Sequence, residues 1–272
     1  MSLDLEKIES HRLAYPRLRE MIREVLFVER VESTNRVALE MASDGMPGGL
    51  LILSDSQRKG KGRLDRQWFS PAGANLYFSM LLRPYLPVRE FPLFSMAASL
   101  ALRDGIQRVA GIISEIKWPN DILIEEKKLA GILLESKTSG GETTPLVIGI
   151  GVNVNVDPEG FPRTLKKTAT SLKAVLGHAV DRTDLLNVIL EALSEQISLL
   201  HEGKKDLLIQ RIQKECATLG KKVRVNTIRQ EFEGLAEEID GDGALLIRMG
   251  DGRLRRILIG DITHLRETVG HD

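Results

Sequence analysis

The sequence predicts an α/β fold of α+β character, with a mixed sheet flanked by helices and a small β-barrel at the C-terminus. Up to residue 219, strand-like apolar runs alternate with helical patterns. One helical stretch, 91–111, is apolar almost all round and is therefore expected to be buried. After Gly220 the pattern changes to short alternating runs joined by the turns DGDG and GDG. At 272 residues the chain is long enough for one large and one small domain, which we expect at 1–219 and 220–272.

The elements of the expected large domain follow from periodicity and turn residues. Continuous apolar runs predict buried strands, and Ser33, Thr34 or Asn35 provides the cap of a helix that runs to Met41. Pro119 and the polar tip EEKK divide the segment 114–136 into three strands joined by turns. In chain order we expect a charged helical lead-in at 1–24, strands at 25–34, 50–55 and 75–83, a helix at 91–111, the three strands within 114–136, a strand at 145–155, a surface loop at 156–170, and helices at 183–201 and 205–219.

Composition limits the functional classes. Lys plus Arg and Asp plus Glu both number 38, so the net charge is zero and a bulk attraction to DNA or to an anionic membrane is not supported. The N-terminus lacks the apolar core of a signal peptide, and no apolar run approaches the roughly 18 residues of a membrane span. The single cysteine, Cys216, fits a reducing cytoplasm and is expected to be a packed thiol. The five histidines show no ligand spacing, so we expect no metal ligands.

A glycine-rich basic loop, QRKGKGRLDRQW at 57–68, is the first candidate binding element. It places Gln57, Lys61, Arg63 and Arg66 around two glycines and ends at Trp68. Glycine permits close backbone approach, and guanidinium groups bind phosphate or carboxylate. A solvated basic loop is equally compatible with this composition, and the P-loop pattern is absent.

The segment KWPND, with Lys117 and Asp121, is the second candidate, together with Lys128 after the next turn. A hairpin here brings Lys128 near Asp121 or Lys117. A lysine and a carboxylate on one sheet face neutralise an anionic substrate and handle a proton. The alternative is a surface salt bridge, which contributes at most about 1 kcal/mol.

Two weaker patterns complete the set. Gly149 and Gly151 in a strand predict a bulge or a close backbone approach, but the third glycine of a dinucleotide-binding motif is missing. The segment ESTN, 32–35, predicts either a helix start that binds an anion or a carbonyl oxygen, or an ordinary cap. No nucleophile motif of the G-x-S-x-G type occurs.

The order of these pieces resembles one family. ESTN, DSQRKGKGRLDRQWFSPAGANLYFSM, KWPNDILIEEKKLAGILLES and VIGIGVNVN, followed by a β-rich tail, closely resemble the biotin–protein ligases, or biotin–[acetyl-CoA-carboxylase] ligases. The resemblance implies a catalytic domain akin to class II aminoacyl-tRNA synthetases and an SH3-like C-terminal barrel. The family's loop usually reads G-R-G-R-x-x-R-x-W, so Lys61 here replaces an arginine and keeps its charge without the bidentate fork.

The resemblance also implies a two-step reaction. The biotin carboxylate attacks the α-phosphate of ATP, accompanied by Mg²⁺, to give biotinyl-5′-AMP, and a lysine of a biotin carboxyl carrier domain then attacks that mixed anhydride. The catalytic residues implied are Arg63, Lys128, Lys117 and Asp121, with Asp121 as a proton acceptor. The positions implied to bind biotin and ATP are Ser33, Thr34, Asn35 and Gln57 at the ureido head, Lys61, Gly62, Arg63 and Arg66 in the loop, Trp68 near adenine, Lys128 at the biotin carboxylate, Gly149 and Gly151 as a shallow pocket floor, and Asn153 near the nucleotide.

Other functions stay open on the sequence. A lipoate or octanoate ligase is the nearest enzyme alternative, because that family is related and also forms an acyl-adenylate. A biotin-responsive transcriptional regulator is the alternative of a different class. Residues 1–27 are too few for a helix-turn-helix unit of roughly 60 residues, so we expect the form without an N-terminal DNA-binding domain and no DNA or membrane partner. Family members are monomers or dimers, which leaves a homodimer open.

Overall fold

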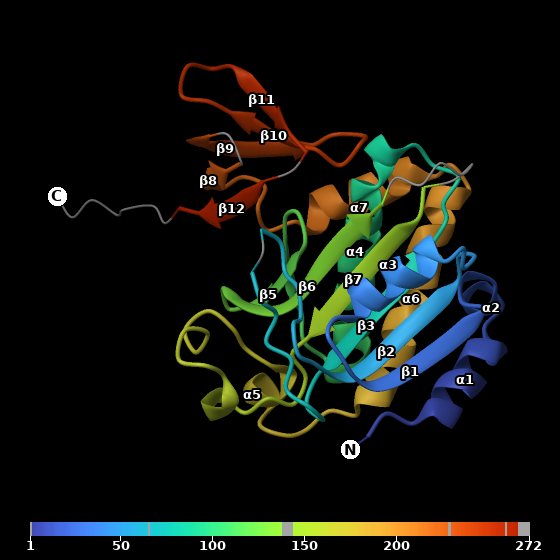
Figure 1. Ribbon diagram of the computed structural model, residues 1–272. Coiled ribbons are helices and arrows are strands. Elements are labelled where there is room, and N and C mark those ends of the chain that lie inside the picture. The colour runs from blue at the N-terminus through green and yellow to red at the C-terminus, as the bar shows by residue number, and fades with distance from the viewer. Residues whose placement is uncertain (1, 65, 138–143, 228–229, 259, 266–272) are drawn as a thin grey trace.

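The computed structural model describes residues 2–64, 66–137, 144–227, 230–258 and 260–265, which form a large sheet flanked by helices and a second, smaller sheet (Figure 1). In the seven-stranded sheet the order is β1-β2-β3-β7-β6-β5-β4. Only β1 and β2 run parallel, and the other neighbours are antiparallel. This confirms the expected mixed sheet. Its strands are β1 (Glu24–Val31), β2 (Leu50–Gln57), β3 (Leu76–Leu82), β4 (Glu115–Lys117), β5 (Asp121–Ile124), β6 (Lys127–Ser136) and β7 (Leu146–Val152).

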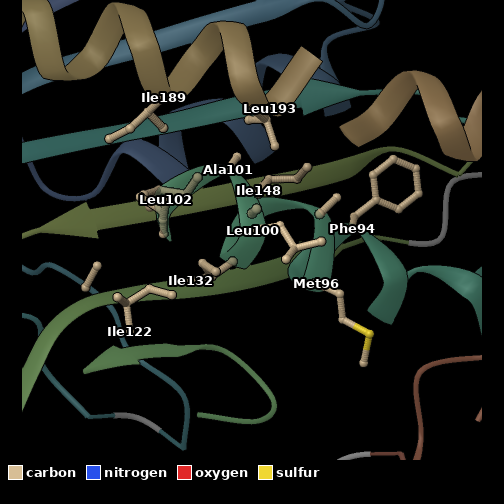
Figure 2. Packing of buried hydrophobic residues seen from close by; sticks show 14 of the residues in the cluster. Phe94, Met96, Leu100, Ala101, Leu102, Ile122, Ile132, Ile148, Ile189 and Leu193 are labelled. Carbon is tan, nitrogen blue, oxygen red and sulfur yellow. The ribbon is translucent and has the colours of Figure 1, made fainter. Parts of the chain in front are cut away.

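Side chains alternate between the two faces of this sheet and so define two packing layers. In β2, Leu51 and Leu53 join the main core, whereas Leu50 and Ile52 pack with α3 (Thr34–Ser43). The main-core face is covered by α4 (Pro92–Ala110) and α6 (Arg182–His201), with Ile148 of β7 beneath the apolar side chains of α4 (Figure 2). On the other face, α3 packs against β2, β3 and β7.

The N-terminal helices α1 (Leu5–Ala14) and α2 (Pro16–Met21) confirm the expected helical lead-in. Asp4 caps α1 by accepting a hydrogen bond from the Lys7 backbone N–H at 3.0 Å. The Asp4 backbone N–H in turn donates to Thr183 Oγ1 at 3.0 Å, and Ile8 and Leu18 are buried. These helices thus form part of the helical layer around α6. Of the helices in the described ranges, none has the length and apolar character to cross a membrane.

The C-terminal tail folds into a five-stranded antiparallel sheet in the order β11-β10-β9-β8-β12. Gly243 and Gly252, in the turns DGDG and GDG, have φ of +85° and +84°, which favour glycine. The Trp118 indole N–H donates to the Gly243 carbonyl oxygen at 3.1 Å, which joins this sheet to the KWPND segment. The strands are β8 (Lys222–Asn226), β9 (Glu231–Ile239), β10 (Leu245–Arg248), β11 (Leu254–Ile257) and β12 (Asp261–His264).

Several elements differ from expectation, and the first strand, β1, ends at Val31 rather than at residue 34. The helix α3 ends at Ser43, two residues beyond Met41, and α7 (Lys205–Glu215) ends before the buried Cys216, whose backbone is extended. The segment 156–170 is not only a surface loop, because it contains the 3₁₀ turn η2 (Pro158–Gly160) and the buried Phe161. The elements not expected from periodicity are η1 (Val88–Glu90) and α5 (Leu172–Leu176), both too short to show it.

Candidate active site

A cavity of about 400 Å³ lies on the α3 side of the large sheet. It is enclosed by the start of α3, the basic loop, the hairpin of β4 and β5, the middle of β6 and β7, and the segment 161–169. Every residue that the sequence singled out lies in its lining, although these residues come from segments up to 120 positions apart. They are Ser33, Thr34, Asn35, Gln57, Lys61, Gly62, Arg63, Arg66, Trp68, Lys117, Asp121, Lys128, Gly149, Gly151 and Asn153.

At the start of α3, side chains from other strands satisfy the polar groups. Ser33 makes no side-chain cap, and the Thr34 backbone N–H instead donates to Gln57 Oε1 at 2.9 Å. Ser79 Oγ lies 2.7 Å from Thr34 Oγ1 and 2.6 Å from Asn35 Oδ1. Because these groups are buried, their orientation is fixed before any ligand arrives.

The basic loop is folded into a tight hairpin. The Gly62 N–H donates to the Arg66 carbonyl oxygen at 2.6 Å, and the Trp68 N–H donates to the Gly60 carbonyl oxygen at 2.8 Å. A Cβ at Gly60 would lie 2.6 Å from the Trp68 carbonyl oxygen, so this position requires glycine. The loop thereby brings its cations over the sheet and seats Trp68 in the cavity.

The glycines of β7 make room for two side chains. A Cβ at Gly149 would lie 1.9 Å from Asn35 Oδ1, and one at Gly151 would lie 2.4 Å from Trp68 Nε1. The register of β7 with both neighbours is regular, so the close approach rather than a bulge explains the glycines. Asn35 and Trp68 therefore occupy the space that we expected to form a shallow floor.

Two lysines of the cavity, Lys128 and Lys61, each lie close to a carboxylate. Lys128 Nζ lies 2.6 Å from Asp121 Oδ1, which confirms the contact expected from the hairpin. Lys128 also stands 5.4 Å from the centroid of the Trp68 ring. Lys61 Nζ lies 3.2 Å from Glu135 Oε1, a residue just outside the lining.

Two of the three arginines of the loop, Arg63 and Arg66, meet the C-terminal sheet. Arg66 Nη2 lies 2.6 Å from Asp261 Oδ2, and Arg63 Nη1 lies 3.9 Å from Asp261 Oδ1. Arg63 also donates to Asn120 Oδ1 at 2.9 Å and to the Gly260 carbonyl oxygen at 3.1 Å. Burial lowers the pKa of Arg63 from its usual value, and the Asp261 charge opposes that shift. Arg63 is thus held by three groups, whereas the exposed Arg66 is held by Asp261.

Lys117 is a half-buried cation of the site. Burial lowers its pKa from the ordinary lysine value, and the nearby Lys128 adds to this effect, while Asp121 opposes it. A lysine in this state releases a proton more readily than an exposed one. The arrangement of Lys117, Asp121 and Lys128 on one hairpin is suited to neutralising an anion and transferring a proton.

The side chain of Asn153 is held by a series of hydrogen bonds that runs to Arg182 of α6. Asn75 Nδ2 donates to Asn153 Oδ1 at 3.3 Å, and the Val154 N–H donates to Asn75 Oδ1 at 2.9 Å. The buried Arg182 donates to the Asn75 carbonyl oxygen and to Asp55 Oδ1, both at 2.9 Å. The end of β7 is therefore tied to the first turn of α6.

Several lining residues were not singled out by the sequence. Asn120 and Gly131 lie inside the quoted motifs, so a signal was present, and a Cβ at Gly131 would lie 3.1 Å from Trp68 Cζ3. Asp261 and the residues of 161–169 carried no such signal, because only the fold brings them to the cavity. The latter are Phe161, Leu165, Thr168 and Ala169.

Comparison with known proteins identifies the family of this chain. Residues 27–153 match the Biotin/lipoate A/B protein ligase family, and residues 218–265 match the Biotin protein ligase C terminal domain. The Bifunctional ligase/repressor BirA of Bacillus subtilis is 35% identical over 240 residues, which cover 88% of this chain and 73% of that protein. The Biotin--[acetyl-CoA-carboxylase] ligase of Paracoccus denitrificans is 34% identical over 227 residues, covering 82% of this chain and 94% of the relative.

Solved structures agree with the sequence relatives. The biotin protein ligase from Aquifex aeolicus, solved in complex with biotin and ATP, superposes with a TM-score of 0.76 at 29% sequence identity. The match covers 90% of this chain and 100% of that one. With its cavity, its loop and its two sheets, this chain belongs to the biotin protein ligase family.

Proposed function

We propose that this chain activates biotin with ATP to form biotinyl-5′-AMP and then transfers the biotinyl group to a lysine of a biotin carboxyl carrier domain. The observation that carries the proposal is the gathering of Lys61, Arg63, Arg66 and Lys128 in one cavity with the buried polar start of α3. Relatives named biotin ligases and a solved relative with biotin and ATP support the same substrates.

In the first step an oxygen of the biotin carboxylate attacks the α-phosphorus, and the bond to the bridging oxygen of pyrophosphate breaks. Two anions repel each other on approach, so the barrier falls where fixed cations face both. Lys128 is proposed to hold the biotin carboxylate, and Arg63, Arg66 and Lys61 are proposed to face the phosphates. The loop would lie over both ligands and keep water from the adenylate.

Mg²⁺ is proposed to accompany ATP and to lower the charge of its phosphates. Mg²⁺ keeps several water ligands and needs few protein carboxylates when phosphate oxygens are available. Within the described residues, no group of three or more His, Cys, Asp or Glu side chains is placed to hold a metal ion. This donor set fits an ion that is held mainly by the nucleotide.

In the second step the carrier amine attacks the carbonyl carbon of the adenylate, an amide bond forms, and the bond to the AMP oxygen breaks. The proton released by the amine needs an acceptor. Asp121 is the proposed acceptor, and its contact with Lys128, 2.6 Å from Nζ to Oδ1, orients the carboxylate. Lys117, on the same hairpin, is proposed to stabilise the charge that develops on the leaving AMP.

The proposed organisation is a catalytic domain at 1–219, akin to class II aminoacyl-tRNA synthetases, and an SH3-like barrel at 220–272. The change from mixed to antiparallel pairing after Gly220 supports this division, and residues 266–272 lie outside the described part of the chain. We also propose that the chain forms a homodimer. Light scattering with and without biotin and ATP tests this.

The decisive experiment is incubation with biotin, ATP, Mg²⁺ and a biotin carboxyl carrier domain, read by mass spectrometry. We expect one biotinyl group on one lysine of the carrier and none on a carrier with that lysine replaced by arginine. Parallel reactions with lipoate and octanoate test the related ligases, and transfer of either in preference to biotin would overturn the assignment. Because relatives include proteins named ligase/repressor, DNA binding by this chain is tested as well. A gel shift with DNA at several salt concentrations tests the alternative that the chain is a biotin-responsive transcriptional regulator.

A further inference from the structure

Glu135 of β6, just outside the cavity lining, links the start of α3 to the basic loop. Its Oε2 accepts a hydrogen bond from Asn35 Nδ2 at 2.8 Å, and its Oε1 lies 3.2 Å from Lys61 Nζ. One carboxylate therefore contacts both the buried start of α3 and the ammonium group of a loop lysine. The Glu135 side chain is 24% exposed, whereas that of Lys61 is 50% exposed, so the carboxylate is the more firmly seated partner.

The Asn35 amide has no hydrogen left for a ligand. Asn35 Nδ2 donates to Glu135 and, at 3.3 Å, to the Leu133 carbonyl oxygen, while Asn35 Oδ1 faces Ser79 Oγ at 2.6 Å. An amide carries two N–H donors, and both are used within the protein. Asn35 therefore acts as a support that orients Glu135 rather than as a donor to biotin.

Lys61, by contrast, keeps donors for an anion. An ammonium group has three N–H donors, and the contact with Glu135 uses one of them. A lysine side chain loses considerable rotamer freedom when it is fixed, and it lacks the planar fork of arginine. A carboxylate that holds Lys61 over the cavity compensates for both deficits.

We propose that Glu135 is a positioning residue that fixes the Lys61 ammonium group for the anions of the adenylation step. This inference rests on the proposed function. It explains how a lysine serves at the loop position where arginine is usual, because the protein supplies the orientation that the side chain lacks.

The test separates the two contacts of Glu135. In Glu135→Gln the side-chain oxygen still accepts from Asn35, but the charge that holds Lys61 is removed. Biotin-dependent exchange of labelled pyrophosphate into ATP measures the first step alone. We expect kcat of this exchange to fall about tenfold, with the Kd of biotin unchanged within a factor of about two.

A double-mutant cycle identifies the route of the effect. In the Lys61→Met background, Glu135→Gln should have no further effect on kcat, because the group that it positions is gone. Glu233→Gln, which removes an exposed partner of Arg224 on the C-terminal sheet, is the matched control and should leave kcat unchanged. Equal losses in both backgrounds, or an unchanged kcat in Glu135→Gln, would overturn the inference. Absence of exchange in the wild type would instead refute the proposed function.

Discussion

Arg63 of the basic loop and Asp261 of β12 face each other across the boundary between the two sheets, with Nη1 and Oδ1 3.9 Å apart. Arg66 Nη2 lies 2.6 Å from the same carboxylate, so Asp261 is shared by Arg63 and Arg66. The Gly260 carbonyl oxygen, next to Asp261, accepts a further hydrogen bond from Arg63. The C-terminal sheet thus contributes directly to the cavity and is more than an appended module.

Replacing Asp261 tests this contribution. In Asp261→Asn the arginines lose their shared counter-ion while the side-chain volume is kept. We expect kcat/KM for ATP to fall threefold to tenfold, which corresponds to about 1 kcal/mol, because the phosphates then meet a less ordered loop. The exposed pair of Asp251 and Arg253 provides a control, since Asp251→Asn should have no effect on pyrophosphate exchange. An unchanged kcat/KM in Asp261→Asn would show that the loop is positioned without it.

Arg63→Ala removes the best-held cation of the loop. The variant loses the bonds to Asn120 and Gly260 and leaves Asp261 with Arg66 alone. We expect biotin affinity to fall by about tenfold and biotinyl-5′-AMP to escape into solution faster than it is consumed. Chromatography of the free adenylate during single-turnover reactions measures the escape. Wild-type affinity together with wild-type retention of the intermediate would refute this role.

Gly151→Ala tests the close approach of Trp68 to β7. The added methyl group would lie 2.4 Å from the indole nitrogen, so the ring has to move. A displacement on the order of 1 Å in an active site can cost about 100-fold in rate, and we expect a loss of this size in adenylation. Gly241→Ala, where nothing lies within 4 Å, should retain full activity. Near-normal activity of Gly151→Ala would mean that adenylation does not depend on the position of the Trp68 ring.

Lys117→Met should separate stability from activity. Burial lowers the pKa of Lys117, so its charged form is less favourable in the folded protein than in the unfolded chain. The variant should therefore have a higher free energy of unfolding at pH 7. The gain should shrink as the pH rises towards 10.5, where the wild-type amine also becomes neutral. Urea unfolding at pH 7 and 9.5 measures this, and adenylation should fall about tenfold. A loss of stability at pH 7 would contradict the expectation.

The partly buried position of His264 in β12 leads us to expect that the free energy of unfolding depends on pH in the acid range. Burial, aided by the charges of Lys221 and Lys117, lowers the pKa of His264 to about 4. Between pH 6.5 and 4 the unfolded chain therefore binds the proton more readily, so stability falls as the pH drops through this window. Since the ring is partly exposed, we expect its share to be about 1–2 kcal/mol.

His264→Gln isolates this histidine from the many other groups that titrate in acid. The variant lacks the imidazole and should lose less stability than the wild type between pH 6.5 and 4.5. Urea unfolding at several pH values measures the difference. His178→Gln, at an exposed ring, provides the control and should follow the wild type. Parallel curves for wild type and His264→Gln would assign the acid sensitivity elsewhere.

The local features of the molecule follow from its amino-acid sequence alone. Apolar runs and turn residues predicted the strands of the large sheet and the antiparallel tail, because periodicity and turn chemistry act over a few residues. The motifs also indicated which residues share a site, and the hairpin predicted the contact between Lys128 and Asp121. Short elements such as α5 were not predicted, because five residues are too few to show a helical periodicity.

Tertiary packing, by contrast, determines which charged groups far apart in the sequence neutralise one another. Asp261 lies almost 200 positions after Arg63, and no local pattern links them, yet packing of the C-terminal sheet places their charges together. The roles of Gly149 and Gly151 were settled in the same way, because Asn35 and Trp68 fill the space beside them. Such contacts depend on which sheet faces pack together in the folded protein. The positions of the residues along the chain do not indicate this packing.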